Sequence, residues 1–192
     1  MGTRLPLMAV DLDGTLVRGN TLHEYIRCGL RHGGIRSRLR ILAALTLRRL
    51  RVSSHVAMKR RVLAAIRPDA AFVADFRGRV DAMRRPEVDA LMRRHREAGG
   101  IVVLATAASE LYVPLIWDGD SVSTDARCAV ECRGAEKLRR VLSYAEARGA
   151  RLDTVVTDHP DDMPLLARPG VRRVIVGAHP GLAGVSADLR IR

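Results

Sequence analysis

Four short apolar runs constrain the fold of this chain more than any other feature. They read LMAV, IVVLA, TVVT and RVIV, at residues 7–10, 101–105, 154–157 and 173–176. Continuous hydrophobicity over four or five residues is typical of strands that are covered on both faces. Such strands occur in parallel sheets, so the sequence predicts an α/β fold with a doubly wound, Rossmann-like parallel sheet.

Helical patterns accompany the last three runs. One helix is expected after Ala108, and a second from about Ala135 to Arg148, where Gly149 is suited to the position just beyond a helix end. Strands that alternate with helices in this way form βαβ units, which is the connection that a parallel sheet needs.

A long segment between the first two runs has helical patterns and no strand pattern. Thr21 and Glu24 have the spacing of a capping box that opens a helix. Further helical stretches are expected near residues 35–51, 54–67 and 69–84, and from Pro86 to Gly99. The sequence therefore predicts a helical cap at residues 18–98, inserted into a core made of residues 1–17 and 99–192.

The positive charge of the chain is concentrated in this insertion. The whole chain has 33 basic and 21 acidic residues, and residues 18–96 hold 20 of the basic and 6 of the acidic ones. Three interpretations stay open: solvated arginine-rich helices, a field that attracts an anionic phosphorylated substrate, or a basic helix at residues 35–51 that contacts an anionic membrane peripherally. Nucleic acid is disfavoured, because aromatic residues make up 3% of the chain and no groove-reading motif is present.

Length and apolar content favour a cytoplasmic protein, with the inner face of the membrane as a peripheral alternative. The 192 residues suffice for one core with an insertion. No apolar run approaches the ~20 residues of a membrane span, and aspartates interrupt the N-terminal segment where a signal peptide would be apolar. Three cysteines are an odd number for a secreted disulfide framework, so we expect reduced thiols. The oligomeric state is left open.

Polar side chains follow the predicted strands at the edge where parallel sheets bind ligands. They are Asp11 and Asp13 after the first run, Thr106 after the second, Asp158, Asp161 and Asp162 after the third, and Lys137 in the first turn of a predicted helix. Lys137 and Lys59 are the two lysines of a chain whose other basic residues are all arginine. The sequence therefore predicts one polar site at this edge.

The chemistry of these groups indicates a phosphate site. Each pair of carboxylates at about 4 Å costs roughly 4 kcal/mol at an effective dielectric constant near 20, which a divalent cation would relieve. Oxygen ligands favour Mg²⁺, which commonly shares its coordination shell with a substrate phosphate. One carboxylate could then act as a nucleophile and a second could transfer protons, while a hydroxyl and a lysine hold phosphate oxygens.

Four segments in this order resemble the motifs of the haloacid dehalogenase superfamily. They are DLDGT at residues 11–15, VVLATAAS at 102–109, GAEK at 134–137 and TDHPDDMPLL at 157–166. The helical insertion resembles the cap of the phosphoserine-phosphatase-like branch. The resemblance implies a Mg²⁺-dependent phosphatase that hydrolyses a phosphomonoester, of a small molecule or linked to a lipid, through an aspartyl-phosphate.

The resemblance also implies a role for each matching residue. Asp11 would be the nucleophile, and Asp13 the acid that protonates the leaving oxygen and then the base that activates water. Thr106, its neighbour Ala107, and Lys137 would bind phosphoryl oxygens. The metal ligands would be Asp11, Asp13 through its backbone carbonyl, Asp158 and Asp162. His23 and His159 are candidates for substrate contact, with partly exposed structural histidines as the alternative.

Two departures from the family pattern accompany the resemblance. Thr157 and His159 flank Asp158 where many relatives have glycine and a small residue, and the segment after Thr106 is short. Two other functions also stay open. One is a basic docking module with an idle hydrolase core, and the other is a phosphotransferase that shares the first half-reaction.

Overall fold

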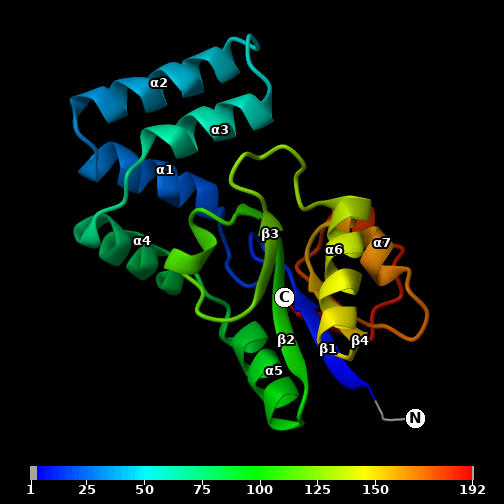
Figure 1. The fold of residues 1–192 in the computed structure, drawn as a ribbon. Helices are drawn as coiled ribbons and strands as arrows, with labels where there is room; N and C mark the ends of the chain where they lie inside the picture. The colour runs from blue at the N-terminus through cyan, green and yellow to red at the C-terminus, as the bar shows by residue number, and fades with distance from the viewer. Residues whose placement is uncertain (1–3, 192) are drawn as a thin grey trace.

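The computed structural model describes residues 4–191, and a six-stranded parallel sheet lies at its centre (Figure 1). The strands are β1 (Leu5–Val10), β2 (Ile101–Ser109), β3 (Ser121–Thr124), β4 (Ala150–Thr157), β5 (Arg172–Val176) and β6 (Leu189–Ile191). Their order is β3-β2-β1-β4-β5-β6. The strand order therefore reverses between β1 and β4, which is where doubly wound sheets bind ligands. The predicted fold class is confirmed.

Strand β1 is buried on both faces of the sheet, as its continuous apolar sequence predicts. Leu7 and Ala9 pack into one hydrophobic cluster, and Met8 and Val10 pack into another on the opposite face. Alternate side chains of a strand point to opposite faces, so four consecutive apolar residues serve two cores at once. This burial fixes the position of the residues that follow Val10.

Helices cover the two faces. Helix α5 (Pro86–Glu97) packs against β2, and α6 (Gly134–Ala147) packs against β2, β3 and β4, next to the short α7 (Met163–Leu166). Val88 and Met92 of α5 belong to one hydrophobic cluster, and Val141 and Ala145 of α6 to the other, so the two helices lie on opposite faces. The predicted helix that ends before Gly149 is confirmed as α6.

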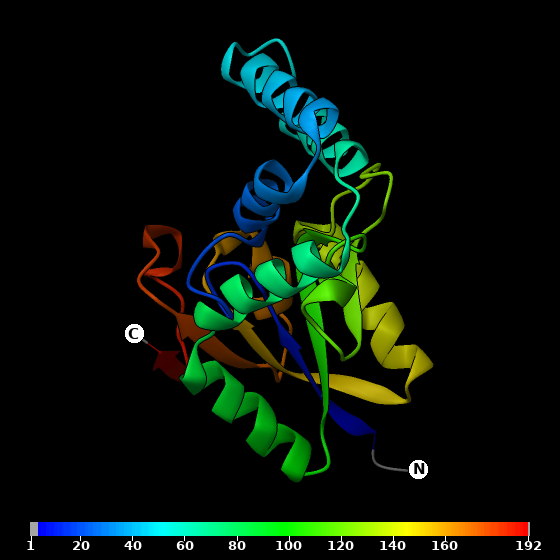
Figure 2. The same cartoon turned by 90° about the vertical axis from the view of Figure 1, so that its left-hand side faces the viewer.

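Four helices form the insertion between β1 and α5. They are α1 (Thr21–His32), α2 (Ile35–Arg49), α3 (His55–Ala65) and α4 (Ala70–Ala82). Helix α1 packs against α2 and α4, and α2 packs against α3. Figures 1 and 2 show α1 beyond the carboxyl ends of the strands, with the α2–α3 pair farther still from the sheet. The cap therefore stands over the edge where Asp11 and Asp13 lie.

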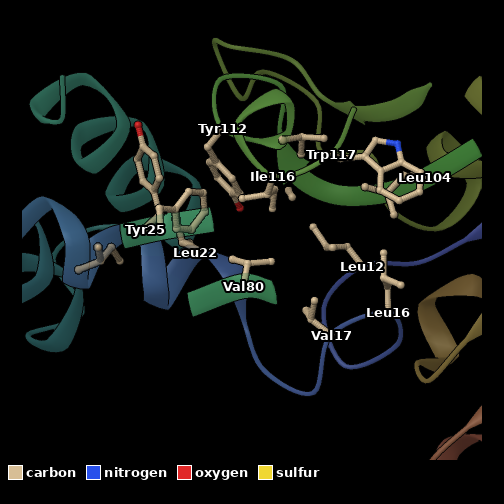
Figure 3. Close-up of a cluster of buried hydrophobic side chains, with 14 of the residues drawn as sticks. Leu12, Leu16, Val17, Leu22, Tyr25, Val80, Leu104, Tyr112, Ile116 and Trp117 are labelled. Carbon is tan, nitrogen blue, oxygen red and sulfur yellow. The ribbon is translucent and has the colours of Figure 1, made fainter. Parts of the chain in front are cut away.

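Aromatic side chains join the cap to the core. Tyr25 of α1 stacks on Tyr112 of the core, with ring centroids 4.9 Å apart, and Phe72 and Phe76 of α4 meet Tyr25 edge to face. Figure 3 shows Tyr25 and Tyr112 side by side in this apolar cluster. Both phenylalanines and two of the three tyrosines of the chain lie here. Most of its few aromatic residues therefore pack the cap against the core.

Two expectations about local structure are wrong. The helix expected after Ala108 is absent from the described residues: β2 runs to Ser109, and a three-residue 3₁₀ turn at Val113–Leu115 follows. Pro114 lacks an N–H group and its ring obstructs the preceding turn, so a helix that begins near Ser109 cannot continue through it. Helix α1 begins at Thr21 without the expected capping box, because the side chain of Asn20 caps it instead.

The boundary of the cap stays a proposal. Helix α5 lies within the predicted cap at residues 18–98, but it packs on the sheet through β2. We therefore propose that the cap ends near Arg84, where the chain re-enters the core through a bridge between Arg84 and Val17. Within residues 4–191, every helix is too short or too polar to span a lipid bilayer.

Candidate active site

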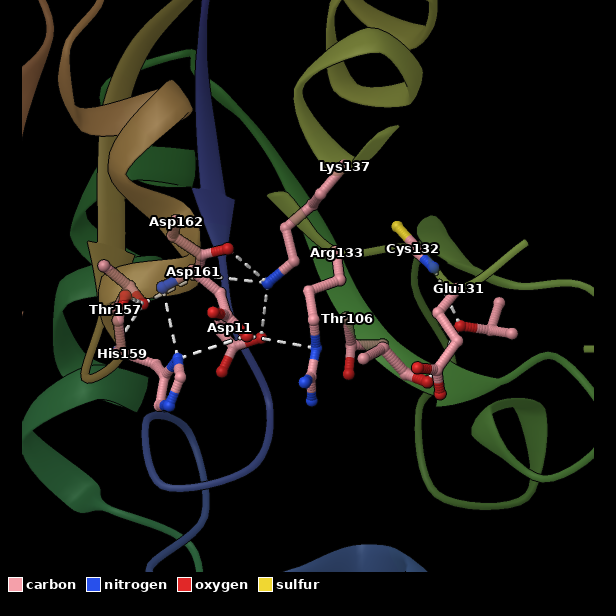
Figure 4. Close-up of polar contacts among 12 residues, drawn as sticks. Asp11, Thr106, Glu131, Cys132, Arg133, Lys137, Thr157, His159, Asp161 and Asp162 are labelled. Atoms are coloured by element: carbon pink, nitrogen blue, oxygen red, sulfur yellow. Dashed lines mark hydrogen bonds and ion pairs between the residues drawn. The ribbon is translucent and has the colours of Figure 1, made fainter. Parts of the chain in front are cut away.

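Asp11 and Lys137 form the centre of the polar cluster at the carboxyl edge of the sheet. The Lys137 ammonium lies 2.8 Å from Asp11 Oδ1, and 2.7 and 3.0 Å from the two oxygens of Asp162 (Figure 4). Thr157, at the end of β4, donates its hydroxyl to Asp162 Oδ2 at 2.7 Å. Lys137 therefore has a fixed position between two carboxylates, and Asp162 is itself fixed by Thr157.

The second oxygen of Asp11 is less engaged. Asp11 Oδ2 has the Thr15 hydroxyl 3.5 Å away, whereas the backbone N–H of Asp11 donates to the Val156 carbonyl and anchors the residue on β4. One oxygen of Asp11 is thus held by Lys137, while the other is available to a ligand. This is the arrangement that a carboxylate nucleophile needs.

Asp13 lies at the entrance to the cap. Its Oδ1 accepts the backbone N–H of Thr21 at 2.6 Å, which places the carboxylate at the N-terminus of α1. An unsatisfied N–H group and the positive end of the helix dipole both favour a carboxylate at this position. Asp13 therefore links the first motif to the first cap helix.

Gly14 and Thr15 bring Asp158 against the loop that carries Asp11 and Asp13. Gly14 has a φ of +82°, and a Cβ atom there would lie 2.1 Å from Asp158 Oδ2. The buried Thr15 hydroxyl donates to Asp158 Oδ1 at 2.9 Å. A residue with a side chain at position 14 would therefore displace the Asp158 carboxylate, in addition to the strain of the positive φ.

Thr106 and Ala107 lie opposite Asp11, at the end of β2. The Thr106 hydroxyl accepts the backbone N–H of Ala108 at 3.0 Å, which leaves its own proton free for an anion. The Ala107 carbonyl accepts two donors, Lys59 Nζ at 2.7 Å and the Thr124 hydroxyl at 2.8 Å. Lys59 reaches this point from cap helix α3 and also pairs with Glu131 at 3.1 Å.

Two cavities meet at Asp13. The first, of about 270 Å³, is lined by Asp11, Thr106, Lys137 and their neighbours. The second, of about 130 Å³, lies under the cap between apolar side chains such as Leu22 and Met58 and the polar head of Lys59. Asp13, Asn20, Ala107 and Arg133 line both cavities. The site thus has a charged chamber beside Asp11 and a second chamber under the cap, whose wall is partly apolar and partly polar. The two chambers share part of their walls.

The two candidate histidines line different chambers. His159 lies at the first, where its Nδ1 accepts the Asp161 N–H at 3.2 Å, and His23 lies at the second. Asp161, which sequence analysis placed at this edge without assigning it a role, pairs with Arg133 at 3.1 Å. The structure therefore brings the predicted site residues to one edge of the sheet, where all but Asp158 line one or both chambers and Asp158 lies against Gly14 and Thr15.

Burial controls the charge balance of the site. It raises the pKa of Asp11 to about 7, against the opposing charge of Lys137. It also raises the pKa of Asp13, although the Thr21 N–H lowers it. Burial alone would lower the pKa of Lys137, but Asp11 and Asp162 hold it above its ordinary value. One buried ammonium thus leaves the carboxylates short of positive charge.

The residues present fit a divalent cation held by few protein ligands. Among residues 4–191, no three or more His, Cys, Asp or Glu side chains gather closely enough to hold a metal by themselves. Asp158 is nevertheless seated in the space that Gly14 leaves open, beside the Asp11 loop. Two carboxylates with a backbone carbonyl suit Mg²⁺, which keeps waters and takes oxygens from a phosphate.

Sequence analysis did not assign four residues that the structure adds to the site. They are Thr15, Asn20, Lys59 and Arg133. A signal existed for Lys59, because a lysine is rare in this arginine-rich chain, but its sequence position gave no indication that a cap helix would reach the end of β2. Thr15, Asn20 and Arg133 are polar residues in loops, where a turn or a helix cap is the ordinary interpretation.

The fold and the site define an α/β protein with a carboxylate and lysine centre at the switch point of a parallel sheet. A family model described as haloacid dehalogenase-like hydrolase matches residues 9–167. The chain therefore belongs to the haloacid dehalogenase-like hydrolases, as the four motifs predicted. A search of curated proteins gave no match.

Solved structures share the fold at low sequence identity. A protein of unknown function from Bordetella pertussis Tohama I is 20% identical, with a TM-score of 0.77 over 99% of both chains. A phosphoserine phosphohydrolase-like protein from Francisella tularensis is 12% identical, with a TM-score of 0.60 over 98% of this chain and 95% of that one. A phosphoserine phosphatase, described as a phospho-aspartyl intermediate analogue, is 14% identical, with a TM-score of 0.56 over 98% and 94%.

Proposed function

We propose that this hydrolase is a Mg²⁺-dependent phosphatase that cleaves a small phosphomonoester through an aspartyl-phosphate. The observation that carries the proposal is that the two oxygens of Asp11 differ: Lys137 holds Oδ1, whereas Oδ2 has the Thr15 hydroxyl 3.5 Å away, and Asp11 lines a chamber together with Thr106. A phosphoserine phosphatase of similar fold is described as a phospho-aspartyl intermediate analogue, which supports the same nucleophile here. Release of inorganic phosphate from a panel of phosphomonoesters, with and without Mg²⁺, tests the proposal.

The reaction divides between the two aspartates. Asp11 Oδ2 attacks phosphorus, the bond from phosphorus to the ester oxygen breaks, and Asp13 gives its proton to that oxygen. Asp13 then takes a proton from water, whose oxygen attacks phosphorus and frees Asp11 and inorganic phosphate. The position of Asp13 supports this role, because it lies where the charged chamber meets the one under the cap.

Lys137 and Thr106 would share the charge of the phosphoryl group with a bound metal ion. Asp11, Asp158 and the backbone carbonyl of Asp13 would hold Mg²⁺, which supplies positive charge to the phosphate oxygens. We propose that Asp162 is a positioning residue for Lys137 instead of a metal ligand, because both of its oxygens lie within 3.0 Å of the Lys137 ammonium. The Thr106 hydroxyl and the Lys137 ammonium donate to the other oxygens.

Removal of Mg²⁺ by a chelator is expected to abolish phosphate release, and its return to restore it. Asp158→Ala should raise the Mg²⁺ concentration for half-maximal activity by about tenfold or more, because a direct carboxylate ligand is lost. A matched control is Asp161→Ala, since Asp161 pairs with Arg133 at the rim. Calorimetry gives a second readout: Mg²⁺ should raise the Tm of the control, and of Asp158→Ala much less. Activity unaffected by chelator would contradict the metal, and no phosphate release with or without Mg²⁺ would favour an idle core.

The chamber under the cap is proposed to receive the leaving group. Its wall combines Leu22, Ile26 and Met58 with the ammonium of Lys59, so a small alcohol with an apolar part and an oxygen function suits it. Lys59 is 3% exposed and is held by the Ala107 carbonyl and Glu131. It therefore fixes the position of the cap relative to the Thr106–Ala107 segment.

Lys59→Met should lower kcat/KM for the best ester by about 10-fold to 100-fold, because the Ala107 carbonyl and Glu131 lose their shared donor. The unpaired groups should also reduce the free energy of unfolding by about 1–3 kcal/mol. Arg60→Met, one residue further along α3 at an exposed position, is the matched control and should change neither quantity. Equal kinetics in the two variants would show that Lys59 is not part of the site.

A further inference from the structure

The outer surface of α2 and of the turn after it is apolar and uncovered. It consists of Ile35, Leu39, Leu42, Leu50 and Val52, with 49% to 73% of each residue exposed. These are five of the ten large hydrophobic residues that are exposed among residues 4–191, so half of the total lies on one helix and its turn. Scattered exposed leucines need no explanation, but a gathered set indicates an interaction site.

Helix α2 has two apolar faces, of which only one has a partner among residues 4–191. Ile41 and Ala44 are its buried residues, on the face that packs against α3. Ile35, Leu39 and Leu42 are spaced by four and three residues, so they form a stripe on the opposite side. About half or more of each of these side chains stays uncovered by residues 4–191, so the apolar character of the second stripe points to something outside the chain.

Positive charge surrounds this stripe. Residues 25–68 contain 12 arginines and lysines and no aspartate or glutamate. Arg36 borders the stripe on one side and Arg49 on the other, and Arg40 lies one turn beyond Arg36, toward α3. All three are exposed and form no ion pair inside the described residues. The surface is therefore apolar along its centre, cationic along its edges and free of compensating acid.

We propose that the outer surface of α2 docks on an anionic lipid membrane. The leucines and Ile35 enter the boundary between headgroups and acyl chains, and the arginines bind lipid phosphates. Figures 1 and 2 show the α2–α3 pair at the end of the molecule farthest from the core, so the core can remain in water while α2 lies on the lipid.

Other occupants fit the surface less well. A second copy of the chain would bring two sets of unpaired arginines together around the apolar stripe, and like charges at short distance are unfavourable. Nucleic acid would satisfy the arginines but leave the leucines without a partner, because phosphate contacts come from charged and polar groups. An anionic bilayer satisfies both parts of the surface.

Flotation with vesicles tests the proposal on the whole chain. We expect binding to vesicles of phosphatidylcholine mixed with phosphatidylglycerol, weaker binding to phosphatidylcholine alone, and a steep loss with added salt. Leu39→Gln/Leu42→Gln should weaken binding about tenfold or more at unchanged charge. Arg36→Gln/Arg40→Gln should weaken it similarly, whereas the matched control Arg168→Gln/Arg172→Gln, at exposed positions of the core, should not. A Leu42→Trp variant should show a blue shift of its fluorescence on the anionic vesicles.

Three results would overturn the proposal. One is absence of binding to anionic vesicles at low salt. Another is binding that the arginine variants lose and Leu39→Gln/Leu42→Gln keeps, which would indicate a cationic surface that also takes nucleic acid. The third is a dimer in lipid-free solution that Leu39→Gln/Leu42→Gln dissociates, which would assign the surface to a second copy. Phosphate release from a water-soluble ester, measured on the same samples, reports the proposed function separately.

Discussion

Asp11→Asn is expected to give a folded protein that releases phosphate about 10⁴-fold to 10⁶-fold more slowly, the range seen when a covalent catalytic group is removed. The amide has nearly the same shape as the carboxylate, but its oxygen is too weak a nucleophile to attack phosphorus. Lys137 keeps its contacts with Asp162, so the buried ammonium is not left without a partner. Steady-state phosphate release, together with the Tm, measures both parts of this expectation.

Asp13→Asn provides the contrast. The amide oxygen can still accept the Thr21 N–H, so the start of α1 should be preserved. Loss of proton transfer should slow turnover by about 10²–10⁴, and a phosphorylated protein should accumulate because Asp11 is still present. Intact-mass measurement after mixing with substrate should detect this phosphate in Asp13→Asn and not in Asp11→Asn. Turnover of Asp11→Asn at the rate of the unaltered protein would refute the nucleophile.

The strands that are covered on both faces could be predicted from the sequence. Strands β1, β2, β4 and β5 carry continuous apolar runs, because each lies in the middle of the sheet and serves two cores. Strands β3 (SVST) and β6 (LRI) were not predicted. They are edge strands of four and three residues, so burial does not impose a pattern on them.

The residue types and the location of the site could be predicted better than the contacts between its side chains. The positions of Asp11 and Asp13 follow from the end of β1, and that of Lys137 from the start of α6. The contact of Lys59 with the Ala107 carbonyl depends on how the cap is seated, which in turn depends on tertiary contacts such as that between Tyr25 and Tyr112. Sequence periodicity contains no information about those contacts.

Asp162 illustrates the same limit. A carboxylate after β4 was expected among the metal ligands, and it stays a candidate for the site. Its side chain turns instead toward Lys137 and Thr157, as one partner of a buried ion pair. Spacing along the chain placed Asp162 at the correct edge, but the direction of its side chain follows from the short 3₁₀ turn at Pro160–Asp162.

Lys137→Met is expected to lower phosphate release by about 10²–10³, because the developing charge on the phosphoryl oxygens loses its ammonium. It should also lower the free energy of unfolding by about 3–5 kcal/mol, since Asp162, at 2% exposure, is left as an unpaired buried carboxylate. Lys137→Arg keeps the charge, but its planar guanidinium has a different reach and donor geometry. It should therefore retain more stability than Lys137→Met while recovering little of the activity.

A double variant separates catalysis from folding. Lys137→Met/Asp162→Asn removes both charges of the buried pair, so it should regain much of the stability that Lys137→Met loses, because an uncharged amide replaces the unpaired carboxylate. Activity should stay at the level of Lys137→Met, since the ammonium is still absent beside Asp11. Denaturant unfolding and phosphate release give both quantities. They are measured on the unaltered protein, Lys137→Met, Lys137→Arg and the double variant. Recovery of activity together with stability would mean that Lys137 serves only to balance Asp162, and the phosphate would then have to be held by Thr106 and the metal without it.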